Sequence, residues 1–68
     1  MMVDLEKVSL VKEFVKVAQD IASEVHLKSG KFVVDAKSIL GIFSLDLSKP
    51  IELVCDEVYL SKFEKFKA

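Results

Sequence analysis

Apolar residues between positions 9 and 23 recur at spacings of three and four, and this pattern constrains the fold more than any other feature of the chain. Such spacing places apolar side chains on one face of an α-helix and charged side chains on the other face. The pattern predicts an amphipathic helix over residues 9–23 that must cover an apolar surface made elsewhere in the chain. The residues of its apolar face are Val11, Phe14, Val15, Ala18, Ile21 and Ala22.

The stretch that follows this helix predicts a β-hairpin. In residues 24–28 apolar side chains alternate with polar ones, and residues 31–36 are rich in β-branched side chains. Ser29 and Gly30 between them form a typical turn. We therefore expect two antiparallel strands that present one apolar face to the helix.

We predict one strand near the start of the chain, and a strand followed by a helix near its end. In residues 2–7 apolar and charged side chains alternate weakly, which predicts a short edge strand. Pro50 can precede a strand over residues 51–55, because the backbone N–H group that proline lacks is not needed at the start of a strand. Asp56 is a suitable N-cap for a helix after that strand. The apolar face of this last helix comprises Tyr59, Leu60, Phe63 and Phe66.

The central stretch, residues 35–45, predicts a strand that runs into a short helix. Ser38 is expected to be the N-cap, because its hydroxyl can accept hydrogen bonds from amides of the first turn. The helix carries apolar residues in more directions than one sheet can cover, and we expect the side with Ile42 and Leu45 to face the core. The other apolar residues are expected to stay partly exposed and to bind a protein partner, namely Ile39, Leu40 and Phe43. Burial of these three under the next loop or the N-terminus is the alternative.

The run KSILGIFSL at residues 37–45 resembles the segment around the regulatory serine of the histidine-containing phosphocarrier (HPr) family of the bacterial sugar phosphotransferase system. The similarity continues upstream in VHL at residues 25–27 and FVVD at residues 32–35. It covers nearly the whole chain, which is expected to form a single domain over residues 1–68. The resemblance implies an α+β fold of order β-α-β-β-α-β-α, an open-faced sandwich with a four-stranded antiparallel sheet and helices on one face. The spacing of the predicted elements favours the same arrangement.

The chain departs from the family at the start of the first helix. There, family members carry a motif of the form Gly-Ile/Leu-His-Ala-Arg-Pro-Ala, in which the histidine takes up the phosphoryl group and the arginine binds the phosphate. The matching positions in this chain hold Lys7, Ser9 and Leu10, no arginine occurs anywhere, and the one proline is Pro50. We therefore predict a protein without catalytic residues, not an enzyme, that acts as a regulatory or protein-binding module. An active phosphocarrier that uses an unorthodox residue is the alternative.

Ser38 has a second interpretation that comes from the resemblance. In many Gram-positive members of the family, a dedicated kinase phosphorylates the matching serine, and the apolar residues beside it dock partner proteins. The resemblance thus implies a regulatory phosphosite at Ser38 and protein partners, either components of the phosphotransferase system or a serine kinase. A phosphate would be favourable at a helix N-terminus. The alternative is that Ser38 serves as the helix cap alone.

The remaining reactive side chains predict no metal or cofactor site. His26 lies in an alternating strand with no second histidine or cysteine nearby, which is typical of a solvated residue facing outward. Cys55 stands among apolar residues and is expected to be a small buried side chain. We expect neither cofactor nor metal.

Composition excludes several classes of partner. The net charge of −1, from ten basic and eleven acidic residues, provides no positive field for nucleic acid. No apolar run approaches the roughly 20 residues that span a membrane, and the acidic start is unlike a signal peptide, so we expect a cytoplasmic protein. One cysteine excludes an internal disulfide. A homodimer that covers a sheet edge or the short helix is a further expectation, and a generic α/β dimerisation domain is the corresponding alternative.

Overall fold

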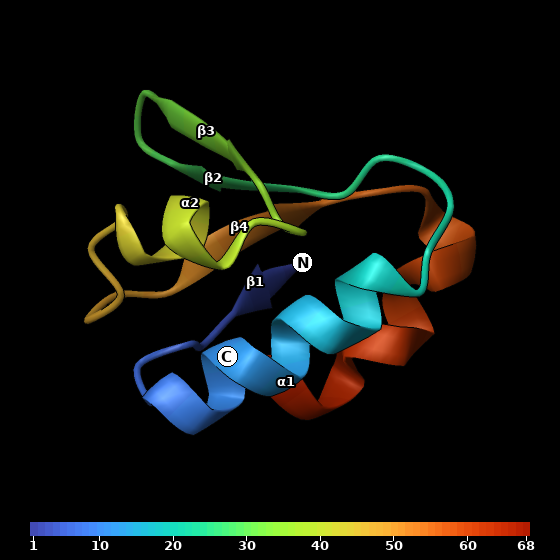
Figure 1. Ribbon diagram of the computed structural model, residues 1–68, viewed down its shortest axis with the longest axis horizontal. Helices are drawn as coiled ribbons and strands as arrows, with labels where there is room; N and C mark the ends of the chain where they lie inside the picture. Colours follow the sequence, from blue (N-terminus) through green and yellow to red (C-terminus); the bar gives the residue numbers. More distant parts are fainter.

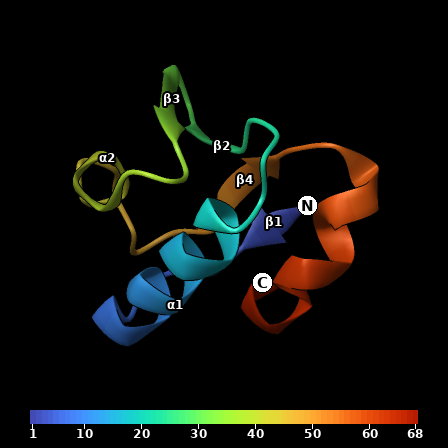
Figure 2. The same cartoon turned by 45° about the vertical axis from the view of Figure 1, so that its right-hand side comes forward.

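The computed structural model describes all 68 residues, which form a four-stranded antiparallel sheet with its helices packed on one face (Figures 1 and 2). The strands lie in the order β1-β4-β2-β3. This arrangement confirms the predicted α+β open-faced sandwich. The elements in chain order are β1 (Met2–Val3), α1 (Val8–Gln19), β2 (His26–Ser29), β3 (Phe32–Asp35), α2 (Ile39–Phe43), β4 (Ile51–Val54) and the 3-10 helix η1 (Glu57–Phe66).

The register of the central strands separates a covered face of the sheet from an open one. Leu27 on β2 lies between Val34 on β3 and Leu53 on β4, and Leu27 and Leu53 are buried under the helices. The next residue along, Lys28, is exposed on the opposite face. Because side chains alternate along a strand, this register fixes the face that each residue of the sheet occupies.

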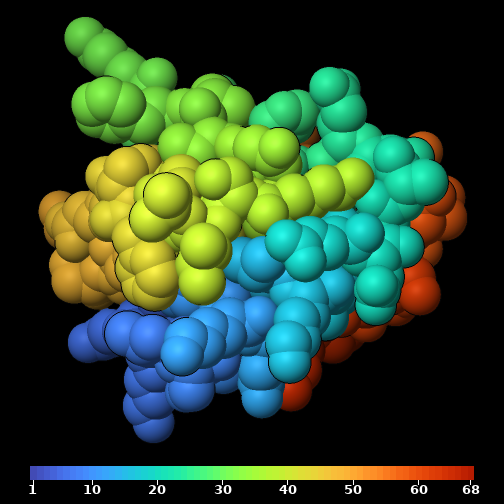
Figure 3. Space-filling model, viewed as in Figure 1, coloured from blue at the N-terminus to red at the C-terminus, as the bar shows by residue number.

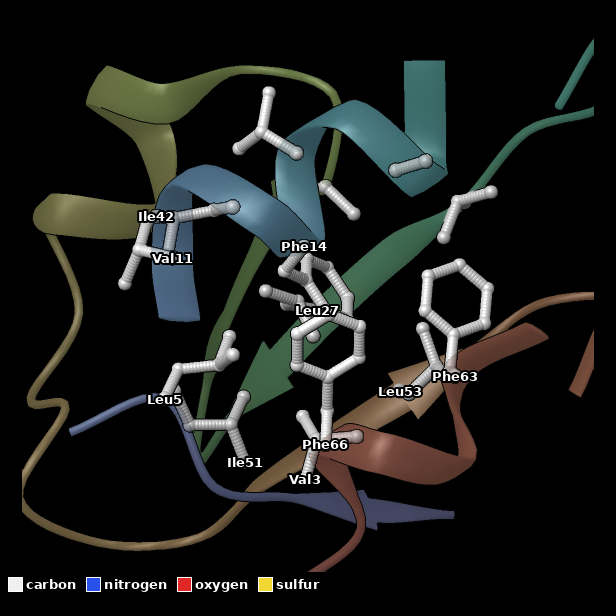
Figure 4. Packing of buried hydrophobic residues seen from close by; sticks show 14 of the residues in the cluster. Val3, Leu5, Val11, Phe14, Leu27, Ile42, Ile51, Leu53, Phe63 and Phe66 are labelled. Carbon is white, nitrogen blue, oxygen red and sulfur yellow. The ribbon is translucent and has the colours of Figure 1, made fainter. Parts of the chain in front are cut away.

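Three phenylalanines form the centre of the core (Figure 4). The ring of Phe14 on α1 lies 5.0 Å from the ring of Phe63 and 5.2 Å from the ring of Phe66, both on η1. Tilted and edge-on ring pairs at such distances contribute about 0.5–1.5 kcal/mol each beyond the apolar area that they bury. These contacts hold α1 and η1 side by side across the covered face of the sheet (Figures 1 and 2).

The first helix is shorter than predicted. Its apolar face is confirmed, since Val11, Phe14, Val15 and Ala18 are buried, but the predicted end at Ser23 is wrong because α1 ends at Gln19. Ala22, which was assigned to the apolar face, is exposed, whereas Ile21 stays buried beyond the helix end.

The segment just beyond α1 is held by the loop before α2. The Lys37 ammonium donates to the carbonyl oxygen of Ile21 at 2.6 Å, and the Gln19 side-chain amide donates to the carbonyl oxygen of Lys37 at 3.2 Å. The last carbonyl groups of α1 are met by the backbone amides of Asp20 and Ile21. The loop before α2 therefore fixes the segment that follows α1 and the direction in which the chain leaves the helix.

The final helix is a 3-10 helix and not the α-helix that its apolar face suggested. Leu60, Phe63 and Phe66 stand three residues apart, and a helix with three residues per turn aligns such positions on one side. Phe63 and Phe66 are fully buried and Leu60 is partly buried. Asp56 caps the helix as predicted, since its carboxylate accepts from the amide of Val58 at 3.1 Å.

The hairpin and the last strand are confirmed, with small changes at their ends. The predicted strands 24–28 and 31–36 are found as His26–Ser29 and Phe32–Asp35. Gly30 in the turn has a φ of +60°, a conformation that a residue with a Cβ adopts only at a cost. The strand predicted over residues 51–55 ends at Val54.

The first strand is only two residues long, and its outer edge is covered. The predicted strand over residues 2–7 is too long, because the Asp4 carboxylate accepts from the Glu6 amide and turns the chain away. The end of the chain then pairs with β1: Val3 forms a bridge with Lys67, and the Ala68 amide donates to the carbonyl oxygen of Met2 at 3.0 Å. The short first strand therefore leaves no open sheet edge for the expected homodimer to cover.

Candidate functional site

The turn between β3 and α2 is fixed by two short side chains. The Asp35 carboxylate accepts from the Lys37 amide at 2.8 Å, and the Ser38 hydroxyl accepts from the Gly41 amide at 3.1 Å. Ser38 is thus the N-cap of α2, as predicted, and it satisfies one of the free amides of the first turn. Ser38 is an exposed residue, and the helix that it caps is five residues long.

Gly41 allows α2 to approach β3 closely. A Cβ added at Gly41 would lie 3.3 Å from the Ser38 hydroxyl oxygen and 3.5 Å from the Cβ of Val34 on β3. Any larger side chain would compete for this space. Gly41 therefore sets the orientation in which α2 lies on the sheet, and with it the set of side chains that face solvent.

This orientation leaves part of the short helix uncovered. Ile42 is fully buried and Leu45 is nearly so, whereas Leu40 is 80% exposed and Phe43 is 41% exposed. Ile39 is partly buried against the core. The predicted division of the helix into an inner and an outer side is confirmed. We call Ile39, Leu40 and Phe43 the α2 patch, and Figure 3 shows α2, in yellow-green, at the surface of the molecule.

The start of α1 carries none of the side chains that the resemblance associates with phosphate transfer. Lys7 is the N-cap residue, and its side chain makes no capping hydrogen bond. Ser9 is exposed and Leu10 is partly buried against the core. No acidic residue stands in the first turn. The polar side chains that Lys7 and Ser9 expose here are therefore a primary amine and a hydroxyl.

His26 and Cys55 lie away from α2. His26 is half-buried on the open face of the sheet, between Val54 and Asp35 on the neighbouring strands. Cys55 is half-buried, which is less than predicted; this burial raises the pKa of its thiol, and the negative charge of Asp56 raises it further. No cluster of three or more histidine, cysteine or acidic side chains is arranged to hold a metal ion.

The surface has two shallow hollows, both beside the turn of the hairpin. The larger, of about 480 Å³, is lined by Lys28, Lys49 and Glu52 among others. The second, of about 440 Å³, lies between Phe32 and the residues that follow α2, Leu45 and Asp46. Neither hollow is lined by Ser38 or by the α2 patch.

One exposed apolar group was missed by the sequence analysis. Phe32 and Val33 on β3 are 71% and 59% exposed. The signal in the sequence is the apolar run Phe32-Val33-Val34 between two opposite charges, Lys31 and Asp35. Val33 lies on the open face of the sheet, whereas Phe32 lies on the same face as Val34 but at the end of β3 beside the hairpin turn.

Comparison with known families gives one finding. The family model described as the PTS HPr component phosphorylation site matches residues 9–57. The matched range begins at Ser9 and includes the rest of α1, the hairpin, α2 with Ser38 and its patch, and β4. No curated protein and no solved structure matches the chain significantly. None of its helices has the length and apolar character needed to cross a membrane.

Proposed function

The chain belongs to the HPr family of the sugar phosphotransferase system, and we propose that it is a non-catalytic member that binds other proteins through the α2 patch. Members of this family are phosphocarriers, not enzymes in the usual sense, and they interact with other proteins of the phosphotransferase system. The proposal assigns the binding surface to α2 and leaves the start of α1 without a role in phosphate transfer.

The observation that carries the proposal is the exposure of Leu40. At 80% exposed it is the most solvent-accessible of the exposed large apolar side chains, and Phe43 follows it three residues later on α2, a spacing that places two side chains on the same side of a helix. Fully burying a leucine side chain contributes about 1.5–3 kcal/mol. Interfaces gain most of their binding energy from a few such apolar or aromatic anchors. A partner that covers Leu40 and Phe43 therefore gains free energy that the isolated chain leaves unused.

Two facts support the absence of phosphoryl transfer through the usual residues. Lys7 stands where the resemblance places the histidine, and the chain contains no arginine to bind the phosphate oxygens. The only histidine, His26, is in β2, on the face of the sheet opposite to the helices. A nucleophile and its phosphate-binding group act together, and here both are replaced.

Ser38 is proposed as the regulatory phosphosite of the same surface. Its residue is exposed and directly precedes the α2 patch. A phosphoserine carries a charge of about −1.5 to −2 at neutral pH, so it would change the apolar surface beside it into a charged one. The partners that fit this proposal are components of the phosphotransferase system and a serine kinase.

The proposal is tested by separating binding from stability. Leu40→Ala and Phe43→Ala are titrated against the general phosphotransferase enzyme and against the serine kinase that acts on this family, with thermal melting of each variant. We expect each to weaken binding to at least one of these proteins by about 30-fold, or ~2 kcal/mol, and Leu40→Ala to melt like the parent chain.

Ile42→Ala is the matched control, because Ile42 lies on the same helix but is fully buried. This variant should lose about 2–5 kcal/mol of folding stability. Ser38→Asp should fold normally and bind differently from the parent. Tight binding by a double variant of Leu40 and Phe43 would refute the proposal.

A further inference from the structure

The outer edge of β3 is the one edge of the sheet that pairs with no other segment of the chain. At the opposite edge, the segment around Lys67 lies along β1. β3 is the last strand in the order β1-β4-β2-β3, and it carries the exposed side chains of Phe32 and Val33. Figure 1 shows β3 at the margin of the molecule, and Figure 3 shows the green hairpin projecting from the body.

The backbone groups that point outward from this edge can be identified from the register. The Ala36 amide donates to the carbonyl oxygen of Val25 at 2.9 Å, across to the neighbouring strand segment. In an antiparallel pair, residues alternate between bonding inward and pointing outward. Phe32, Val34 and Ala36 therefore bond toward β2. The N–H and C=O groups of Val33 and the N–H group of Asp35 point away from the sheet.

The edge ends at Asp35 itself. The carbonyl oxygen of Asp35 accepts from the Ser38 amide at 3.0 Å, where the chain turns into α2. A partner strand can therefore pair with a short segment only, centred on Val33. Unpaired strand edges of this kind are sites where another strand can add to a sheet.

The charged residues on either side of Val33 are complementary to those of a second β3 strand in antiparallel orientation. Lys31 stands two residues before Val33, and Asp35 stands two residues after it. We infer that β3 pairs in antiparallel orientation with β3 of a second copy of this chain, with Val33 opposite Val33, so that two sheets join into one of eight strands. This inference goes beyond the proposed function, because none of its contacts uses the α2 patch.

This register satisfies the exposed groups in a reciprocal way. The Val33 amide of each copy donates to the Val33 carbonyl oxygen of the other, and Lys31 of each copy lies opposite Asp35 of the partner subunit. Phe32 lies opposite Val34 of the partner subunit, which covers part of its ring. Cross-strand pairs of opposite charge or of aromatic and β-branched residues contribute roughly 0.2–1 kcal/mol each. Parallel pairing in register would instead place lysine against lysine and aspartate against aspartate.

The test is the mass of the chain in solution, measured by sedimentation equilibrium over a wide concentration range. The parent chain is expected to approach twice its 7.6 kDa mass as concentration rises. Val33→Pro removes the outward N–H group but no bond to β2, and proline is tolerated on edge strands for this reason. This variant should stay monomeric while keeping the circular dichroism of the parent chain.

A charge variant tests the register separately. Lys31→Glu places two carboxylates against each other at both ends of the pairing, and it should raise the dissociation constant about tenfold or more. Lys12→Glu makes the same change in net charge on the exposed side of α1, and it should dimerise like the parent chain.

Hydrogen exchange on the parent chain gives a readout that needs no variant. The Val33 amide has no partner within one copy, so its protection should appear with the dimer and disappear on dilution. A parent chain that stays monomeric at the highest concentration overturns the inference. So does a dimer whose Val33 amide exchanges freely, since such a dimer must use another surface.

Discussion

The Lys37 ammonium lies 2.6 Å from the carbonyl oxygen of Ile21 and donates a hydrogen bond to it, across 16 positions of sequence. The two residues belong to the loop before α2 and to the segment just beyond α1. The same loop accepts a hydrogen bond from the Gln19 side chain through the Lys37 carbonyl. The end of the first helix and the start of α2 are therefore held by one pair of contacts.

Replacing Lys37 by methionine should lower the free energy of unfolding by about 1–2 kcal/mol. Hydrogen bonds from charged donors contribute about 1.5–3 kcal/mol, and the value is reduced here because the contact is only part-buried. Lys12→Met is the control, since it removes the same charge from an exposed position on α1 and should change stability by less than about 0.5 kcal/mol. Urea unfolding of both variants measures the difference. Equal losses would mean that Lys37 acts through charge alone.

The thiol of Cys55 should react slowly in the folded chain. Burial, with the nearby charge of Asp56, raises the pKa of Cys55 above its ordinary value of 9.0. The thiolate is the reactive form, so at any pH below this range the folded chain holds less of it than the unfolded chain. Alkylation by iodoacetamide, followed by intact mass at several pH values, should be slower in buffer than in urea, and its rate should still be rising above pH 9.0. Equal rates in the two states would contradict this assignment.

The chain should not accept a phosphoryl group from phosphoenolpyruvate through the general phosphotransferase enzyme. Lys7 and Ser9 stand at the start of α1 where the resemblance places the histidine and the arginine of the family motif, and the ring of His26 is on the open face of the sheet. Incubation with both reagents and measurement of intact mass test this, with an orthodox family member as the positive control. A gain of one acid-labile phosphoryl group would show that another residue has taken over.

Much of the fold follows from local patterns in the sequence. The spacing of Phe14, Val15 and Ala18 predicted α1, and the alternation around Leu27 predicted the hairpin. The exposed side of α2 was also predictable, because a helix of five residues cannot bury apolar groups in every direction. Leu40 and Phe43 are the apolar side chains that this helix leaves exposed.

The remaining features depend on residues that are distant in sequence. The segment that follows α1 is held by Lys37, and the short β1 is covered by Lys67. Neither contact has a signal in the local pattern. The 3-10 helix is different: Leu60, Phe63 and Phe66 stand at a strict spacing of three, and this spacing was available in the sequence but was interpreted as α-helical.

The covered edge of β1 limits how large an assembly of this chain can grow. A sheet with two free edges can recruit a strand on each side and extend without end, as in fibrils. Here the Ala68 amide is already bonded to the Met2 carbonyl oxygen, so only the side of β3 can recruit a strand. When β3 pairs with β3 of a second copy, the two remaining outer edges are both β1 edges of this covered kind, so growth through the sheet stops at two chains. In a chain with exposed Phe32 and Val33, a few residues at the other edge of the sheet thus oppose filament growth by strand addition.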